Sequence, residues 1–180
     1  MPAAPEELLS FWRAAGPKRW FAQDLAFDAE ILERFLATHE AAAAGRLSAW
    51  EGAAEGALAL VIALDQFPRN MFRGTPRAFS TDALVLAAAR RAIERGFDRA
   101  IPMPERNFFY LPFEHSENLA DQELCLAFTE ATGDAEAVKW AKIHLDVIRR
   151  FGRFPHRNAA LSRVSTPEEI AYLEGGGFRA

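Results

Sequence analysis

Residues 57–70 read ALALVIALDQFPRN, an uninterrupted apolar run that ends in an acid, an amide and a Phe-Pro-Arg-Asn phrase. A run of this length and composition, between signals that start and stop helices, predicts a buried α-helix. Ser48 and Glu51 precede it at capping-box spacing. Phe67 stands before a proline and is disfavoured in the helical region, so we expect the helix to stop there.

Helix starts and stops of the same kind recur along the chain. The sharpest start is Thr166-Pro167-Glu168-Glu169, which combines an N-cap, a first-turn proline and a capping-box glutamate. No stretch alternates between apolar and polar residues, so we predict about seven or eight helices and no strands. Further helices are expected to begin at Pro5, at Asp24 or Asp28, at Ser80 or Thr81, and at Pro104, Asn118 and Asp134, with Pro112 interrupting the helix that begins at Pro104.

The prediction is therefore an all-α protein built from antiparallel helix pairs. Its 180 residues favour one domain over 1–180, with the glycine-rich end at 175–180 frayed. Cys125 is the single cysteine, so no disulfide can form within the chain, and we expect it in the core. Oligomeric state is not indicated.

Charge and hydropathy argue against two classes of partner, although a local basic patch stays possible. The net charge of −4 and a pI near 5.6 provide no domain-wide basic field for nucleic acid. The longest apolar run, Ala57–Leu64, is far shorter than the roughly 20 residues that cross a bilayer. Met1–Leu9 is acidic and has no hydrophobic signal-peptide core, so we expect a cytoplasmic protein that binds no membrane.

Two similar phrases place polar residues just past predicted helix stops. They are Phe67-Pro68-Arg69-Asn70 and Phe154-Pro155-His156-Arg157-Asn158. Asp65 should lie at the carboxyl end of its helix, where a carboxylate is unfavourable and needs a cation. Arg69, Arg73 and Arg157 are the candidates, because a guanidinium can pair with a carboxylate bidentately.

A third polar segment, Leu111–Asn118, follows the predicted break at Pro112 and contains Glu114, His115 and Glu117. His115 beside Glu114 could act as a general base, although adjacent residues on a helix point to different sides. Asp121, Gln122 and His144 could also join this group. The chain has no zinc-protease, phosphate-loop, di-iron or nucleophile-elbow motif, so we expect no metal and no cofactor.

The polar strings together resemble a known bacterial family. They are residues 64–70 with 73–79, residues 108–117 with 120–122, and residues 150–158, with Phe11-Trp12, Arg19-Trp20-Phe21 and Ser165–Glu169 at the two ends. These strings look like the family catalogued as domain of unknown function 924. The resemblance implies a tetratricopeptide-like helical fold and carries over no activity and no catalytic residue. The chain itself lacks the 34-residue period and consensus of tetratricopeptide repeats.

Three hypotheses for the polar cluster follow. The first is a binding module for a small anionic ligand or an acidic peptide, in a groove between helix pairs. The second is a metal-independent hydrolase or transferase, with His115 as base and Arg69 or Arg157 stabilising negative charge. The third is a purely structural network. The residues concerned are Asp65, Arg69, Asn70, Arg73, Glu114, His115, Glu117, Arg153, Arg157 and Asn158.

Overall fold

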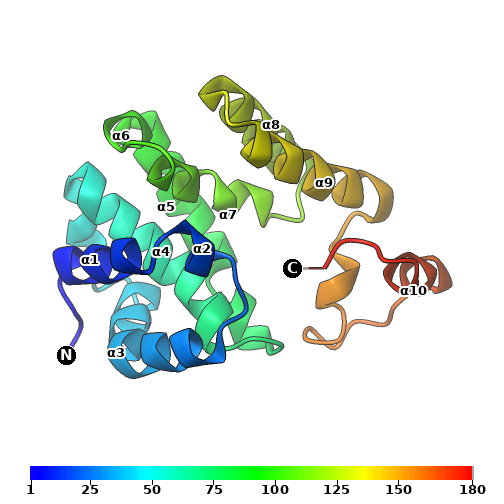
Figure 1. The fold of residues 1–180 in the computed structure, drawn as a ribbon, viewed down its shortest axis with the longest axis horizontal. Helices are drawn as coiled ribbons and strands as arrows, with labels where there is room; N and C mark the ends of the chain where they lie inside the picture. The colour runs from blue at the N-terminus through cyan, green and yellow to red at the C-terminus, as the bar shows by residue number, and fades with distance from the viewer. Residues whose placement is uncertain (180) are drawn as a thin grey trace. The chain divides into compact units, whose positions relative to one another are not determined.

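The computed structural model describes residues 1–179, and within that range the chain is helical, as predicted (Figure 1). It has ten α-helices, four 3-10 helices and no strand in the described residues. The tetratricopeptide-like arrangement stays a prediction. The α-helices are α1 Pro5–Ala15, α2 Pro17–Trp20, α3 Leu25–Ala43, α4 Ala54–Met71, α5 Asp82–Glu94, α6 Phe97–Ala100, α7 Leu111–Glu114, α8 Leu119–Thr132, α9 Ala135–Phe151 and α10 Pro167–Glu174.

The chain forms two compact units. Unit 1 comprises Met1–Arg73 and Arg77–Phe109, and unit 2 comprises Gly74–Pro76 and Tyr110–Ala180. The short 3-10 helices are η1 Ser48–Gly52, η2 Pro76–Phe79, η3 Glu105–Phe109 and η4 Pro155–Arg157. The expectation of one domain stays a prediction, because a division into compact units does not test whether either part folds alone.

Unit 1 is organised around α4, which packs against α1, α3 and α5. Every residue from Gly56 to Pro68 is buried, as the apolar run predicts. The predicted start at Ser48 is wrong, because residues 48–52 form η1 and α4 begins only at Ala54. Gly56 explains the tight connection, since a Cβ there would lie 2.3 Å from the carbonyl oxygen of Trp50.

The predicted stop at Phe67 is also wrong, because α4 continues through Pro68 to Met71. A proline inside a helix leaves the carbonyl four residues earlier without its usual donor. Here that carbonyl belongs to Leu64, and it accepts a 2.6 Å hydrogen bond from the Thr81 hydroxyl. The hydroxyl at the start of α5 thus replaces the missing backbone donor, and the helix continues.

The two later prolines also differ from expectation. Pro104 begins no α-helix, since η3 occupies residues 105–109. Pro112 lies in the first turn of α7 and so begins a helix instead of interrupting one. A proline is tolerated in a first turn because the backbone donor it lacks has no helical acceptor there.

Unit 2 contains the α8–α9 hairpin, whose helices contact each other and are joined by a turn at Gly133 with φ +74° (Figure 1). The predicted caps are confirmed, because Asn118 and Asp134 accept hydrogen bonds from the first turns of α8 and α9. The Thr166 capping box of α10 is confirmed as well. Val147, Ile148 and Phe154 form an apolar cluster in this unit. In the described residues no helix combines the length and apolarity needed to cross a membrane.

Candidate functional site

In unit 1 the buried carboxylate of Asp65 pairs with Arg69. Arg69 Nη1 lies 3.0 Å from Asp65 Oδ1 and 2.9 Å from Asp82 Oδ1. Gln66 Nε2 donates to the other Asp65 oxygen at 2.6 Å. The prediction that Asp65 takes a nearby arginine is confirmed for Arg69. The reason given for it is wrong, because α4 continues past Asp65 to Met71 and the acid does not lie at the helix end.

Asn70 and Arg73 both contact Asp28 on α3. The Asn70 amide donates to Asp28 Oδ1 at 2.7 Å. Arg73 forks onto the same carboxylate, with Nε at 2.5 Å from Oδ2 and Nη2 at 3.0 Å from Oδ1. Asp28 is therefore no helix cap, since Asp24 has that role. These contacts connect α3 to α4 and direct the polar side chains at the end of α4 into the protein.

In unit 2 two more arginines have carboxylate partners. Arg153 forks onto Glu169 at 2.6 and 2.8 Å, and Asn158 Nδ2 lies 3.2 Å from the same carboxylate. The bonds from Arg153 lower the pKa of Glu169 to about 2. Arg163, which sequence reasoning missed, forks onto Glu117 at 2.7 and 3.0 Å. Its partner lies 46 positions away, so no local pattern indicates the pair.

Three histidines of unit 2 come together around aromatic rings, and we call His115, His144 and His156 the imidazole cluster. The His115 and His144 ring centroids are 6.5 Å apart. The Phe178 ring lies 4.3 Å from His144 and 5.3 Å from His156. Phe154 lies 5.6 Å from His144 and 5.5 Å from His156. The cluster thus joins α9, η4 and the segments that follow α7 and α10.

Burial keeps two of these imidazoles neutral. The pKa of His144 falls to about 3 and that of His156 to about 4, in both cases mainly because burial disfavours the charged ring. His144 Nδ1 donates to the Trp140 carbonyl at 2.9 Å and lies 3.4 Å from Glu114 Oε1. His156 Nδ1 is buried, and it makes no hydrogen bond within residues 1–179.

Arg157 adds a positive charge next to the imidazole cluster. It is buried, its guanidinium lies 4.4 Å from the Phe154 ring centroid, and Nη1 donates to the His115 carbonyl at 3.0 Å. Its charge lowers the pKa of both His144 and His156. Arg157 thus adds to the effect of burial in keeping these two rings neutral.

Cys125 and Glu114 are the remaining reactive groups in this part of unit 2. The Cys125 thiol is fully buried, 4.0 Å from Glu114 Oε2. Burial raises the pKa of this thiol, so it stays protonated, as the predicted core position implies. Only the thiolate is an effective nucleophile, so Cys125 is unsuited to nucleophilic catalysis. No three acidic, imidazole or thiol groups among residues 1–179 converge as metal ligands.

The structure thus divides the predicted site residues between the units. Asp65, Arg69, Asn70 and Arg73 belong to unit 1, and the residues from Glu114 onward belong to unit 2. Within unit 2 the structure brings Glu114, His115 and Arg157 together with His144 and His156. The prediction of a hydrolase or transferase with His115 as base stays a prediction.

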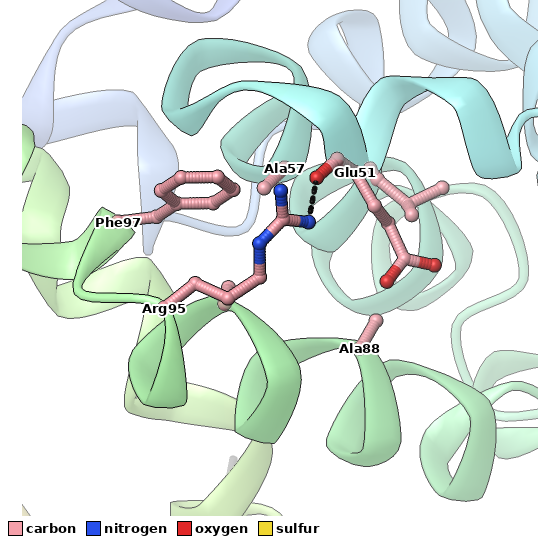
Figure 2. A pocket seen from close by; sticks show the side chains of 7 residues that line it. Glu51, Ala57, Ala88, Arg95 and Phe97 are labelled. Atoms are coloured by element: carbon pink, nitrogen blue, oxygen red, sulfur yellow. Dashed lines mark hydrogen bonds between the residues drawn. The ribbon is translucent and has the colours of Figure 1, made fainter.

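Unit 1 also has a shallow depression, of about 200 Å³ including open solvent, that contains none of the predicted site residues (Figure 2). The Arg95 guanidinium lies 4.4 Å from the Phe97 ring centroid and donates to the Glu51 carbonyl at 2.5 Å. Arg91 pairs with the Glu51 carboxylate. Ala57, Leu60, Ala88 and Ala92 also line the depression. Small apolar side chains beside a hydrogen-bonded arginine are typical of the packing between helices.

The comparisons with known proteins agree with the resemblance seen in the polar strings. The model of the family described as bacterial protein of unknown function (DUF924) matches residues 8–177. The chain belongs to this family. Among solved structures it is similar to the protein of unknown function ATU0120 from Agrobacterium tumefaciens, with 45% identity and a TM-score of 0.93 over 96% of this chain and 97% of that one. No curated protein matches.

Proposed function

We propose that this DUF924 protein binds a small anionic ligand at the imidazole cluster of unit 2, and that it does so in the cytoplasm. One observation carries the proposal. His156 presents a buried ring nitrogen for which residues 1–179 supply no hydrogen bond, beside the positive charge of Arg157. Buried polar atoms are nearly always hydrogen-bonded, and an exception suggests a group supplied from outside.

The charges around His156 favour a negative ligand. Arg157, His115 and Arg163 each oppose its protonation, and Glu117 favours it. The Glu117 oxygens already accept bonds from Arg163 and from the Phe154 backbone. His144, the third imidazole, is buried and neutral. An anion at His156 Nδ1 would stabilise the protonated ring, so binding should be accompanied by proton uptake.

We propose fewer ligand-binding residues than the sequence predicts, and all of them lie at the imidazole cluster. Arg69, Arg73 and Arg153 are engaged with carboxylates of their own unit. Such pairs stabilise helix contacts, which is the role that the structural hypothesis gave them. An acidic peptide would need several cations along an extended surface, so a compact anion fits the arrangement better.

The test uses inorganic sulfate, which does not itself titrate near neutral pH. We expect isothermal titration calorimetry at pH 6, in two buffers of different ionisation enthalpy, to show proton uptake on binding. Long-range ¹H–¹⁵N spectra should shift the His156 ring nitrogens towards the imidazolium position. The variant His156→Gln should lose binding.

The matched control is His39→Gln, because His39 is also a buried histidine but lies in unit 1, bonded through Nδ1 to the Ala63 carbonyl at 2.9 Å. It should bind sulfate like the unaltered protein. If saturating sulfate leaves the His156 resonances unchanged, or if folded His156→Gln binds with equal affinity, the proposed function is wrong.

A further inference from the structure

The ring of Phe178 fills a niche between the side chains of Trp140, His144, Phe154 and His156, and we call this space the ring niche. The Phe178 centroid lies 4.3 Å from His144 and 5.3 Å from His156. The Trp140 and Phe154 rings lie at 6.3 and 6.5 Å. These separations suit contacts between aromatic rings, so the niche accommodates a planar six-membered ring.

The segment that carries this ring is anchored elsewhere. Gly177 N donates to the Tyr172 carbonyl at 2.9 Å, and Phe178 N donates to the Tyr172 hydroxyl at 2.9 Å. Arg179 Nη2 donates to the Leu173 carbonyl at 2.8 Å. All these hydrogen bonds end on α10, whereas the niche is lined by α9, η4 and Phe154. The ring can therefore leave the niche without breaking a hydrogen bond to its walls.

The glycines before Phe178 let the segment pass close to Tyr172. Gly176 has a φ of +81°, a conformation that other residues rarely adopt. At Gly177 a Cβ would lie 2.5 Å from the Tyr172 ring and carbonyl, so only glycine lets the chain pass this side chain. Phe178 is itself only half-buried. Its ring is thus tethered to α10 and lies over the imidazole cluster.

We infer that the ring niche accepts the ring of an aromatic acid in place of Phe178, with the acid group reaching His156. This inference rests on the proposed function and names its ligand class. The two features are adjacent, since Phe178 contacts the same His156 ring whose Nδ1 makes no hydrogen bond within the described residues. A carboxylate or phosphate attached to a planar ring could occupy both at once.

Phe178 would then act as a built-in competitor. A tethered group has an effective concentration in the millimolar range, so a free ligand must displace it. Removing the ring should therefore increase the affinity for an aromatic acid. If the effective concentration of the tethered Phe178 ring is ten times the dissociation constant of that ring from the niche, the increase should be about tenfold. The affinity for sulfate, which has no ring, should change much less.

The experiment compares benzoate, cyclohexanecarboxylate and sulfate by calorimetry and by His156 ring-nitrogen shifts. Phe178→Ala is expected to bind benzoate about tenfold more tightly than the unaltered protein. Cyclohexanecarboxylate should gain less, because its puckered ring cannot stack on an imidazole. The matched control is Phe128→Ala, since Phe128 is a half-buried phenylalanine of unit 2 that packs on Tyr110 and Phe113. It should leave benzoate affinity unchanged.

Failure of this inference differs from failure of the proposed function. If sulfate shifts His156 but Phe178→Ala gains no benzoate affinity, the aromatic acid is wrong and anion binding stands. If neither anion perturbs His156, both fall. If Phe178→Ala does not fold, Tyr172→Phe provides a second test. This substitution removes the hydroxyl that accepts a hydrogen bond from Phe178 N, so it should also increase the affinity for benzoate. No increase in that variant overturns the displacement of Phe178.

Discussion

The protonation of His144 depends on two opposing influences. Burial disfavours the charged ring and lowers its pKa from 6.5 to about 3. Glu114 Oε1, at 3.4 Å from Nδ1, would favour the charged ring. Because the imidazole is only 6% exposed, we expect burial to dominate and the folded protein to hold His144 neutral.

The sign of the pH dependence follows. A histidine with a lowered pKa in the folded state contributes stability that is present above pH 6.5 and is lost as the pH falls towards 3. Between pH 7 and pH 5 the unfolded chain takes up a proton at this position and the folded chain does not. The free energy of unfolding should fall by about 2 kcal/mol on account of His144.

The perturbation is His144→Asn, whose amide can still donate to the Trp140 carbonyl. Urea unfolding followed by tryptophan fluorescence would give the free energy of unfolding of both proteins at pH 7 and pH 5. The loss between the two pH values should be smaller in the variant by about 2 kcal/mol. Any constant cost of removing the ring cancels in this comparison.

Val147→Ala is the control, because it alters a buried, non-titrating residue of the same helix and should leave the pH dependence unchanged. Equal pH dependence in His144→Asn and the unaltered protein would refute the reasoning. A His144 contribution that grows towards pH 5 would show instead that Glu114 holds the ring protonated.

Two further predictions concern stability. Arg69→Met should lower the free energy of unfolding by about 3 kcal/mol, since it removes the guanidinium from the buried Asp65 carboxylate. Lys139→Met, which breaks an exposed ion pair with Glu136, should lower it by about 0.5 kcal/mol or less in the same urea unfolding experiment. Equal effects of the two substitutions would contradict this prediction. Thr166→Ala should cost about 1 kcal/mol, because the hydroxyl accepts from the Glu169 backbone at 3.2 Å. Thr166→Ser should retain most of that stability, and a serine variant as unstable as the alanine would argue against the cap.

The features that could be predicted from the sequence are those whose causes lie within one or two helical turns. The N-caps at Asp24, Asn118, Asp134 and Thr166 bond to backbone donors two or three residues ahead, so local chemistry is enough to locate them. The Asp65–Arg69 pair spans one turn and was predictable for the same reason. The apolar periodicity likewise predicted an all-α chain.

The features that could not be predicted depend on residues distant in the sequence. Phe67 should end its helix by its local sequence, but the hydroxyl of Thr81 satisfies the Leu64 carbonyl and α4 continues. The ion pair of Glu117 with Arg163 and the placement of Phe178 against His144 also join distant segments.

The sequence by itself thus determined the all-helical class and these four caps, because each cap bonds to backbone donors within three residues. The long-range ion-pair partners and the protonation of the polar residues were decided only by the tertiary structure. Contacts between distant segments determine which carboxylates Arg73 and Arg163 meet. Burial, which no local pattern measures, leaves His144 and His156 as neutral rings beside Phe178.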